Sequence, residues 1–180
     1  MAKQRDARLE AQAYRNAIGI LLAGFVLALF TIELAGIDIL LDAVGWLLVF
    51  NGVRPLERPE GGIGPRAALA LGLVAVSALQ LFFTEGMPAV VLAGARAGLE
   101  IVFFLLLIGL FRRILHKFGQ SKTAGVMAFL LAVNAVAAVF WVLRFALPAT
   151  AAVLTAVGAV THVLLVLGLL WVLLCLRSEK

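Results

Sequence analysis

This sequence has little charge. Only 14% of its 180 residues are charged, whereas 64% are hydrophobic and the mean hydropathy is +1.11. Soluble proteins average roughly 25% charged and 45–50% apolar residues. A chain of this length cannot hide so much apolar surface in a water-facing fold, so we expect a lipid bilayer as its solvent. Helices satisfy their own backbone hydrogen bonds in lipid, which makes an all-α helical bundle the expected fold.

Cysteine and histidine are also scarce. The single cysteine, Cys175, excludes an intrachain disulfide and a cysteine-based metal site. The only two histidines, His116 and His162, do not form an H-E-x-x-H pair, and the chain has no G-x-S-x-G segment. We therefore expect no catalytic residue, no metal ion and no cofactor.

The basic residues that are present follow a pattern. All fifteen lysines and arginines except two lie in alternate gaps between apolar segments: Lys3, Arg5, Arg8, Arg15, Arg54, Arg58, Arg66, Arg112, Arg113, Lys117, Lys122, Arg177 and Lys180. The junctions near Gly36, Gly86 and Pro148 contain neither residue type. Cytoplasmic loops of membrane proteins are enriched in Lys and Arg. The pattern predicts six membrane-spanning helices with both termini cytoplasmic, and it explains the net charge of +5 without nucleic acid as a partner.

Proline, glycine and charge place the ends of the predicted spans at about 17–35, 38–53, 66–83, 88–114, 123–147 and 150–176. Residues 1–16 are expected to form a cytoplasmic arm, 17–176 a single six-span membrane domain, and 177–180 a cytoplasmic tail. The pair Arg54-Pro55 is expected to stop the second span. At about 1.5 Å per residue that span reaches only about 24 Å, which is less than the roughly 30 Å of the hydrocarbon layer.

The two basic residues outside the pattern, Arg96 and Arg144, fall in the outer half of the predicted membrane domain. Five of the ten acidic residues lie in the same half: Glu33, Asp38, Asp42, Glu85 and Glu100. An arginine at that depth needs a carboxylate or backbone carbonyls, because it does not lose its proton. Arg96 and Glu100 are spaced i,i+4 and can pair on one helix. Arg144 is expected to pair across helices with Asp42, Asp38 or Glu33.

Asn134 and His162 are expected near the midplane of the bilayer. Each is a candidate ligand-contacting residue, and His162 a candidate proton acceptor, but such residues more often hydrogen-bond a neighbouring helix. The candidate site is therefore Asp38, Asp42, Arg96, Glu100, Arg144, Asn134 and His162. Two interpretations stay open: a polar pocket that binds a ligand from outside, or ion pairs that hold the helices in register.

One segment resembles a known pattern. Residues 36–52 read G-I-D-I-L-L-D-A-V-G-W-L-L-V-F-N-G, and the positions that carry the resemblance are Asp38, Asp42, Gly45, Trp46 and Gly52. The segment is similar to a recurrent one in small bacterial multispan membrane proteins, which reads Ile-Asp-Ile-Leu-Pro-Asp, two apolar residues, Gly and an aromatic residue. Leu41 stands where that pattern has proline. The resemblance implies a bacterial plasma-membrane protein and suggests that Asp38 and Asp42 act together. It implies no activity.

The predicted function is a small transport or ligand-binding component with an outward-facing polar pocket. The alternative is a non-catalytic accessory subunit that stabilises a membrane complex. The expected partners are the lipid bilayer, a small molecule or ion that reaches the pocket from outside, and a second copy of the chain or a membrane partner subunit.

Overall fold

The computed structural model describes residues 2–29, 38–57, 62–117, 121–147 and 150–178, and the statements below concern these residues. They form six helices: α1 (Ala2–Leu29), α2 (Asp38–Glu57), α3 (Pro65–Gln80), α4 (Gly86–Lys117), α5 (Ser121–Ala146) and α6 (Ala151–Ser178). The all-helical prediction is confirmed. The chain divides into two compact units, residues 1–96 with 175–180, and residues 97–174.

Three of these helices are long and apolar enough to cross a membrane: Gly86–His116, Gly125–Leu143 and Ala152–Cys175. Many of their large apolar side chains are exposed, among them Val91, Phe129 and Val153, which suits contact with lipid acyl chains rather than water. The apolar parts of α1 and α3, Gln12–Ala28 and Pro65–Gln80, are shorter. The structure thus supports a membrane protein on three helices, whereas the sequence predicted six spans.

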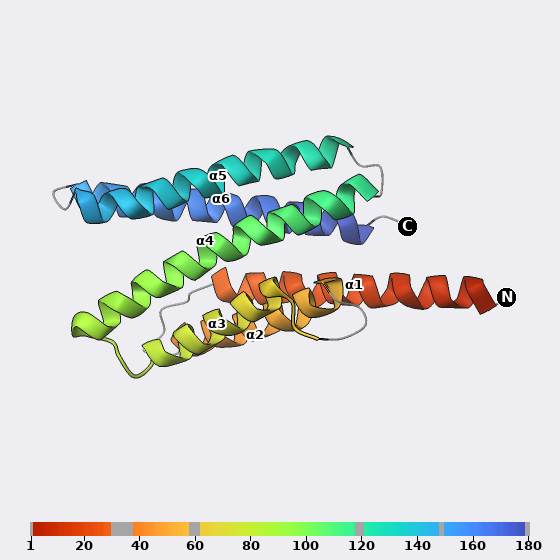
Figure 1. Ribbon diagram of the computed structural model, residues 1–180, viewed down its shortest axis with the longest axis horizontal. Coiled ribbons are helices and arrows are strands. Elements are labelled where there is room, and N and C mark those ends of the chain that lie inside the picture. Colours follow the sequence, from red (N-terminus) through yellow and green to blue (C-terminus); the bar gives the residue numbers. More distant parts are fainter. Residues whose placement is uncertain (1, 30–37, 58–61, 118–120, 148–149, 179–180) are drawn as a thin grey trace. The chain divides into compact units, whose positions relative to one another are not determined.

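In the first unit, α1 packs on α2 and α2 packs on α3 (Figure 1). The contact between α1 and α2 is made through glycine. A Cβ atom added to Gly45 would lie 2.6 Å from the Ala28 backbone nitrogen, and one added to Gly24 would lie 2.7 Å from that of Val49. A Cβ atom added to Gly52 would lie 2.8 Å from the Leu21 backbone nitrogen and 2.9 Å from the Ala17 carbonyl oxygen. Residues later in α1 contact residues earlier in α2, so the two helices are antiparallel.

The close approach of the two backbones fixes which face of α2 is buried. Asp42, Trp46, Val49 and Val53 follow a helical repeat and are all buried. The Trp46 ring packs edge-on against Phe25 of α1, with ring centroids 6.4 Å apart at 84°. The glycines and the tryptophan of the segment 36–52 therefore serve helix packing.

The end of α2 differs from the prediction. Arg54-Pro55 was expected to stop this helix, but α2 continues through Pro55 to Glu57. A proline this close to a helix C-terminus removes only one backbone donor, so the cost is small. The Glu57 carboxylate then accepts hydrogen bonds from the backbone N–H groups of Arg66 at 3.3 Å and Ala67 at 3.2 Å. It thereby caps the N-terminus of α3, where orphan donors and the helix dipole favour an anion.

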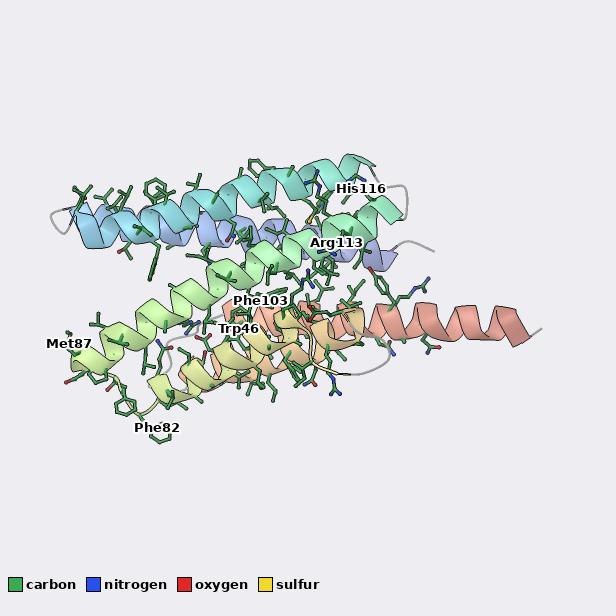
Figure 2. The ribbon with its side chains drawn as sticks, in the orientation of Figure 1. Trp46, Phe82, Met87, Phe103, Arg113 and His116 are labelled. Carbon is green, nitrogen blue, oxygen red and sulfur yellow. The ribbon has the colours of Figure 1, made fainter. Side chains whose placement is uncertain are left out.

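The turn between α3 and α4 carries an exposed apolar tip. Phe82 is 79% exposed and Met87 is 77% exposed, and Figure 2 shows both side chains projecting away from the ribbon. Gly86 starts α4 with φ of +75°, a value that glycine adopts without strain. The junction predicted between the spans at 66–83 and 88–114 is close to the observed one between Gln80 and Gly86. An apolar tip of this kind is suited to a lipid interface.

In the second unit, contacts join the remaining part of α4 to α5 and α6. The Asn134 side-chain nitrogen on α5 donates to the Ile101 carbonyl on α4 at 3.1 Å. His162 on α6 packs against Phe104 on α4, with ring centroids 5.6 Å apart. Leu130 of α5 lies over Gly168 of α6, so these two helices also touch closely.

Replacing Gly45 with alanine tests the contact between α1 and α2. We expect Gly45→Ala to lower the free energy of unfolding by about 1–3 kcal/mol, because the new methyl group meets backbone that cannot turn aside. Thermal unfolding in mild detergent measures the change. Gly109→Ala is the matched control, because a Cβ there meets nothing within 4 Å. Equal stabilities for the two variants would contradict the glycine contact.

Candidate functional site

The residues of the predicted site fall into two groups, one in each unit. Asp42 and Arg96 belong to the first unit, and Glu100, Asn134 and His162 belong to the second. The side chains of Asp38, at the start of α2, and of Arg144, on α5, lie outside the described residues, and so does Glu33.

The first group is an ion pair. Nη1 of Arg96 lies 2.5 Å from Oδ2 of Asp42, and the same nitrogen donates to Oε1 of Gln80 at 3.3 Å. The Asp42 side chain is 6% exposed and that of Arg96 is 23% exposed. The contacts join α2, the end of α3 and the start of α4. A buried carboxylate beside a permanent cation is stabilised as an anion, so this group holds three helix segments in register.

The partner found for Asp42 differs from the one expected first. The sequence assigned Arg96 to Glu100 by its i,i+4 spacing, and assigned Arg144 to the outer aspartates. In the structure Arg96 contacts Asp42. Which cation Asp42 contacts depends on the rotation of α2 about its axis. The glycine contacts with α1 determine this rotation, and the spacing of residues along the sequence does not. Gln80 was not among the predicted residues, because one amide at a helix end gives no signal.

The second group lines a cavity of about 260 Å³ in the second unit. Its polar lining consists of Glu100, Asn134, Thr155 and His162, and its aromatic walls are Phe104 and Trp141. The remaining lining is apolar: Ala97, Ile101, Ala137, Leu154, Gly158, Ala159 and Leu165. Three of the seven residues of the predicted site, Glu100, Asn134 and His162, therefore line this cavity.

The helices position these side chains in a specific way. Asn134 is buried and its amide nitrogen is held by the Ile101 carbonyl, so it fixes α5 against α4 as well as lining the cavity. The ring of His162 is oriented by its edge contact with Phe104. Trp141 lies five residues before the end of α5 and Thr155 four residues after the start of α6. The cavity therefore extends toward the junction of α5 and α6.

A second ion pair was missed by the sequence analysis. Arg66, counted there among the cytoplasmic loop cations, is 8% exposed and its Nη1 lies 2.7 Å from Oε1 of Glu57. Gly64 makes room for this carboxylate, because a Cβ on Gly64 would collide with it. The available signal was the Gly-Pro start of α3, which leaves its donors without a local side-chain cap.

The chemistry open to these residues is binding rather than metal coordination. Within the ranges the structure describes, no group of three or more His, Cys, Asp or Glu side chains is placed to hold a metal ion. The cavity offers one carboxylate, one imidazole, one amide and one hydroxyl among apolar and aromatic walls. Ligand-binding sites in proteins have this mixture of apolar lining with a few polar groups.

Comparisons with known proteins add no family to this description. No family model, no curated protein and no solved structure matches the chain.

A double-mutant cycle tests the Asp42–Arg96 pair. We expect Arg96→Gln to lower the free energy of unfolding by about 3–5 kcal/mol, since it leaves the buried Asp42 carboxylate without this cation, and Asp42→Asn to lower it by less, because the Arg96 side chain is 23% exposed and also contacts Gln80. The double variant is expected to cost clearly less than the sum, because neither charge remains. Unfolding in detergent measures all three.

The control for this cycle is Glu85→Gln, which removes an exposed charge outside any described ion pair. Its stability is expected to stay within about 0.5 kcal/mol of the parent protein. Strictly additive losses for Asp42 and Arg96 would show that the two side chains do not interact.

Proposed function

We propose that the chain crosses a bacterial plasma membrane six times, with both termini in the cytoplasm. The alternation of basic clusters supports this orientation, and three helices have the length and apolar composition of membrane spans. The α3 helix has 16 residues and reaches about 24 Å, so it would need a thinned bilayer or buried ends. The exposed Phe82 and Met87 then lie at the outer surface.

Within this topology the protein is a small transport or ligand-binding component. The observation that carries the proposal is the cavity lined by Glu100, Asn134 and His162. Ionisable groups in membrane-spanning helices are costly, and they are most often found where they line a pathway or a binding site. The cavity extends toward the α5–α6 junction, which has no lysine or arginine and so faces outward in the proposed topology. A ligand would therefore enter from outside.

One observation favours the rival function, an accessory subunit of a membrane complex. The Asp42–Arg96 pair is enclosed and bound to Gln80, as expected for residues that hold helices together. Recovery of a stoichiometric membrane partner after mild solubilisation, with the cavity dispensable for its binding, would favour this role over transport. Asp42 and Arg96 are accordingly assigned to stability in either case.

Cysteine labelling tests the topology. In a Cys175→Ser background, we expect Glu85→Cys and Thr150→Cys to react with a membrane-impermeant maleimide added to intact cells. Ile63→Cys and Arg113→Cys are expected to react only after the membrane is opened, because they lie at junctions assigned to the cytoplasm. Labelling of all four from the same side would contradict the six-span arrangement.

Blocking the cavity tests the binding function. In the Cys175→Ser background, His162→Cys is expected to react with a small charged methanethiosulfonate reagent applied from outside. Gly158 lines the cavity one helical turn from His162, and a Cβ there meets nothing within 4 Å. Adding Gly158→Leu is therefore expected to slow the reaction about tenfold or more, since ~1.4 kcal/mol of added barrier suffices.

Gly109→Leu is the control for this experiment. A Cβ at Gly109 also meets nothing within 4 Å, but Gly109 does not line the cavity. It is expected to leave the rate unchanged. A His162→Cys side chain that does not react from either side would show that water and solutes do not enter the cavity, and would contradict the binding function.

A further inference from the structure

The Asn134 side chain brings a fixed hydrogen-bond acceptor to the cavity of the second unit. Its Nδ2 donates to the Ile101 carbonyl at 3.1 Å. A carbonyl oxygen can only accept a hydrogen bond, so the group that faces Ile101 must be the NH₂, and the orientation of the amide is determined. Asn134 is buried and lines the cavity, and none of the described residues donates to its Oδ1. This oxygen is therefore the side-chain atom of Asn134 that can accept a hydrogen bond from a ligand.

His162 supplies a second polar group from another helix. It lies on α6, and its ring packs edge-on against Phe104, with ring centroids 5.6 Å apart. A neutral imidazole has one N–H donor and one nitrogen acceptor. A ligand hydroxyl both donates and accepts, so it can bond to Asn134 or to His162. An ether oxygen only accepts, so it leaves the Asn134 oxygen without a partner.

The charges around the cavity favour an uncharged ligand. Neither lysine nor arginine is among its described lining residues, so an anion would find no permanent cation there. Glu100 is the one acidic residue of the lining, and it already interacts with another group of the chain. A cation would have to compete for that carboxylate, and an ion of either sign would lose its hydration to a mostly apolar lining. An uncharged ligand avoids these costs.

The size and the walls of the cavity limit the shape of the ligand. The cavity has a volume of about 260 Å³. An apolar protein cavity of about 150 Å³ is large enough to bind benzene, so one ring with a short substituent fits here. Phe104 and Trp141 form aromatic walls, against which another ring can pack edge to face. Gly158 adds no side chain to the lining, and a Cβ there meets nothing within 4 Å.

We propose that this cavity takes a small uncharged alcohol or phenol with an apolar body, whose hydroxyl donates to Oδ1 of Asn134. The inference rests on the proposed binding function and narrows it to one class of ligand. Asn134 thus has two roles: its nitrogen fixes α5 against α4, and its oxygen selects a ligand with a hydrogen-bond donor.

Four probes of similar size test the class: benzyl alcohol, its isomer anisole, which has no hydroxyl, and the ions benzylammonium and benzoate. Ala137 lines the cavity three residues after Asn134. In a Cys175→Ser background, protection of Ala137→Cys from a thiol reagent reports binding to the full chain in lipid nanodiscs. Partition of each probe into empty nanodiscs is subtracted. We expect benzyl alcohol to bind about tenfold more tightly than anisole, because anisole leaves a buried acceptor unpaired, and both ions to bind more weakly than benzyl alcohol.

Three variants assign the preference to the cavity and to Asn134. Asn134→Leu is expected to abolish the difference between benzyl alcohol and anisole, since it removes the acceptor. Gly158→Leu is expected to weaken binding of both isomers without removing any polar group, and Gly109→Leu, outside the cavity, is expected to leave both unchanged. If Asn134→Leu does not fold, the comparison of the two isomers in the parent chain and in Gly158→Leu still decides the proposal.

The possible failures are distinguishable. Equal binding of benzyl alcohol and anisole, both weakened in Gly158→Leu, would overturn recognition of the hydroxyl and leave a ligand-binding cavity. Tighter binding of either ion than of benzyl alcohol would overturn the preference for an uncharged ligand. Absence of binding by all four probes would overturn the inference, and together with an unreactive His162→Cys it would overturn the binding function as well.

Discussion

The contact between α1 and α2 is closer than side chains allow, and the arrangement of the first unit depends on it. Gly24 and Gly45 bring backbone against backbone, and this contact fixes the rotation of α2 about its own axis. With that rotation, Asp42 faces Arg96 and Trp46 faces Phe25. A bulkier residue at the contact would turn the buried face of α2 and separate the ion pair. The glycines at the contact between α1 and α2 thus determine that Asp42 pairs with Arg96.

The second constraint is that polar groups among apolar helices need partners. Glu57 meets two backbone donors and the Arg66 side chain, Asn134 meets the Ile101 carbonyl, and the Thr161 hydroxyl donates to the carbonyls of Val157 and Gly158. The Thr161 contacts lie within α6, whereas the Glu57 and Asn134 contacts join different helices. Polar contacts between helices give specificity where apolar packing alone gives little.

Helices were easier to predict from the sequence than contacts. The last three spans were predicted at 88–114, 123–147 and 150–176 and form Gly86–Lys117, Ser121–Ala146 and Ala151–Ser178. Long apolar runs bounded by proline, glycine or charge leave little choice of helix ends. The end of α2 was missed, because Pro55 was interpreted as a stop. Its continuation places Glu57 at the N-terminus of α3, a tertiary contact that no local rule contains.

The partners of the buried charges were predictable only in part. Charge alternation singled out Arg96 as an exception that needs an acid, and the structure supplies one. Which acid it is depends on the rotation of α2, and so on a glycine contact between residues that are distant in sequence. Glu100, Asn134 and His162 were predicted as part of one seven-residue site from their estimated depth in the membrane, and these three line one cavity. Helical rise gives the depth of a residue along its helix, but sequence spacing does not give the rotation of that helix against its neighbours.

Asp42, which is buried, and Glu100, which is half-buried, therefore have different surroundings. Asp42 is enclosed beside an arginine that stays charged at all ordinary pH, so its charge is balanced within the protein. Glu100 faces a cavity whose described lining residues include no lysine or arginine. Glu100 thus borders the space in which a ligand would lie in the proposed function. One carboxylate joins helix segments, and the other lines the cavity.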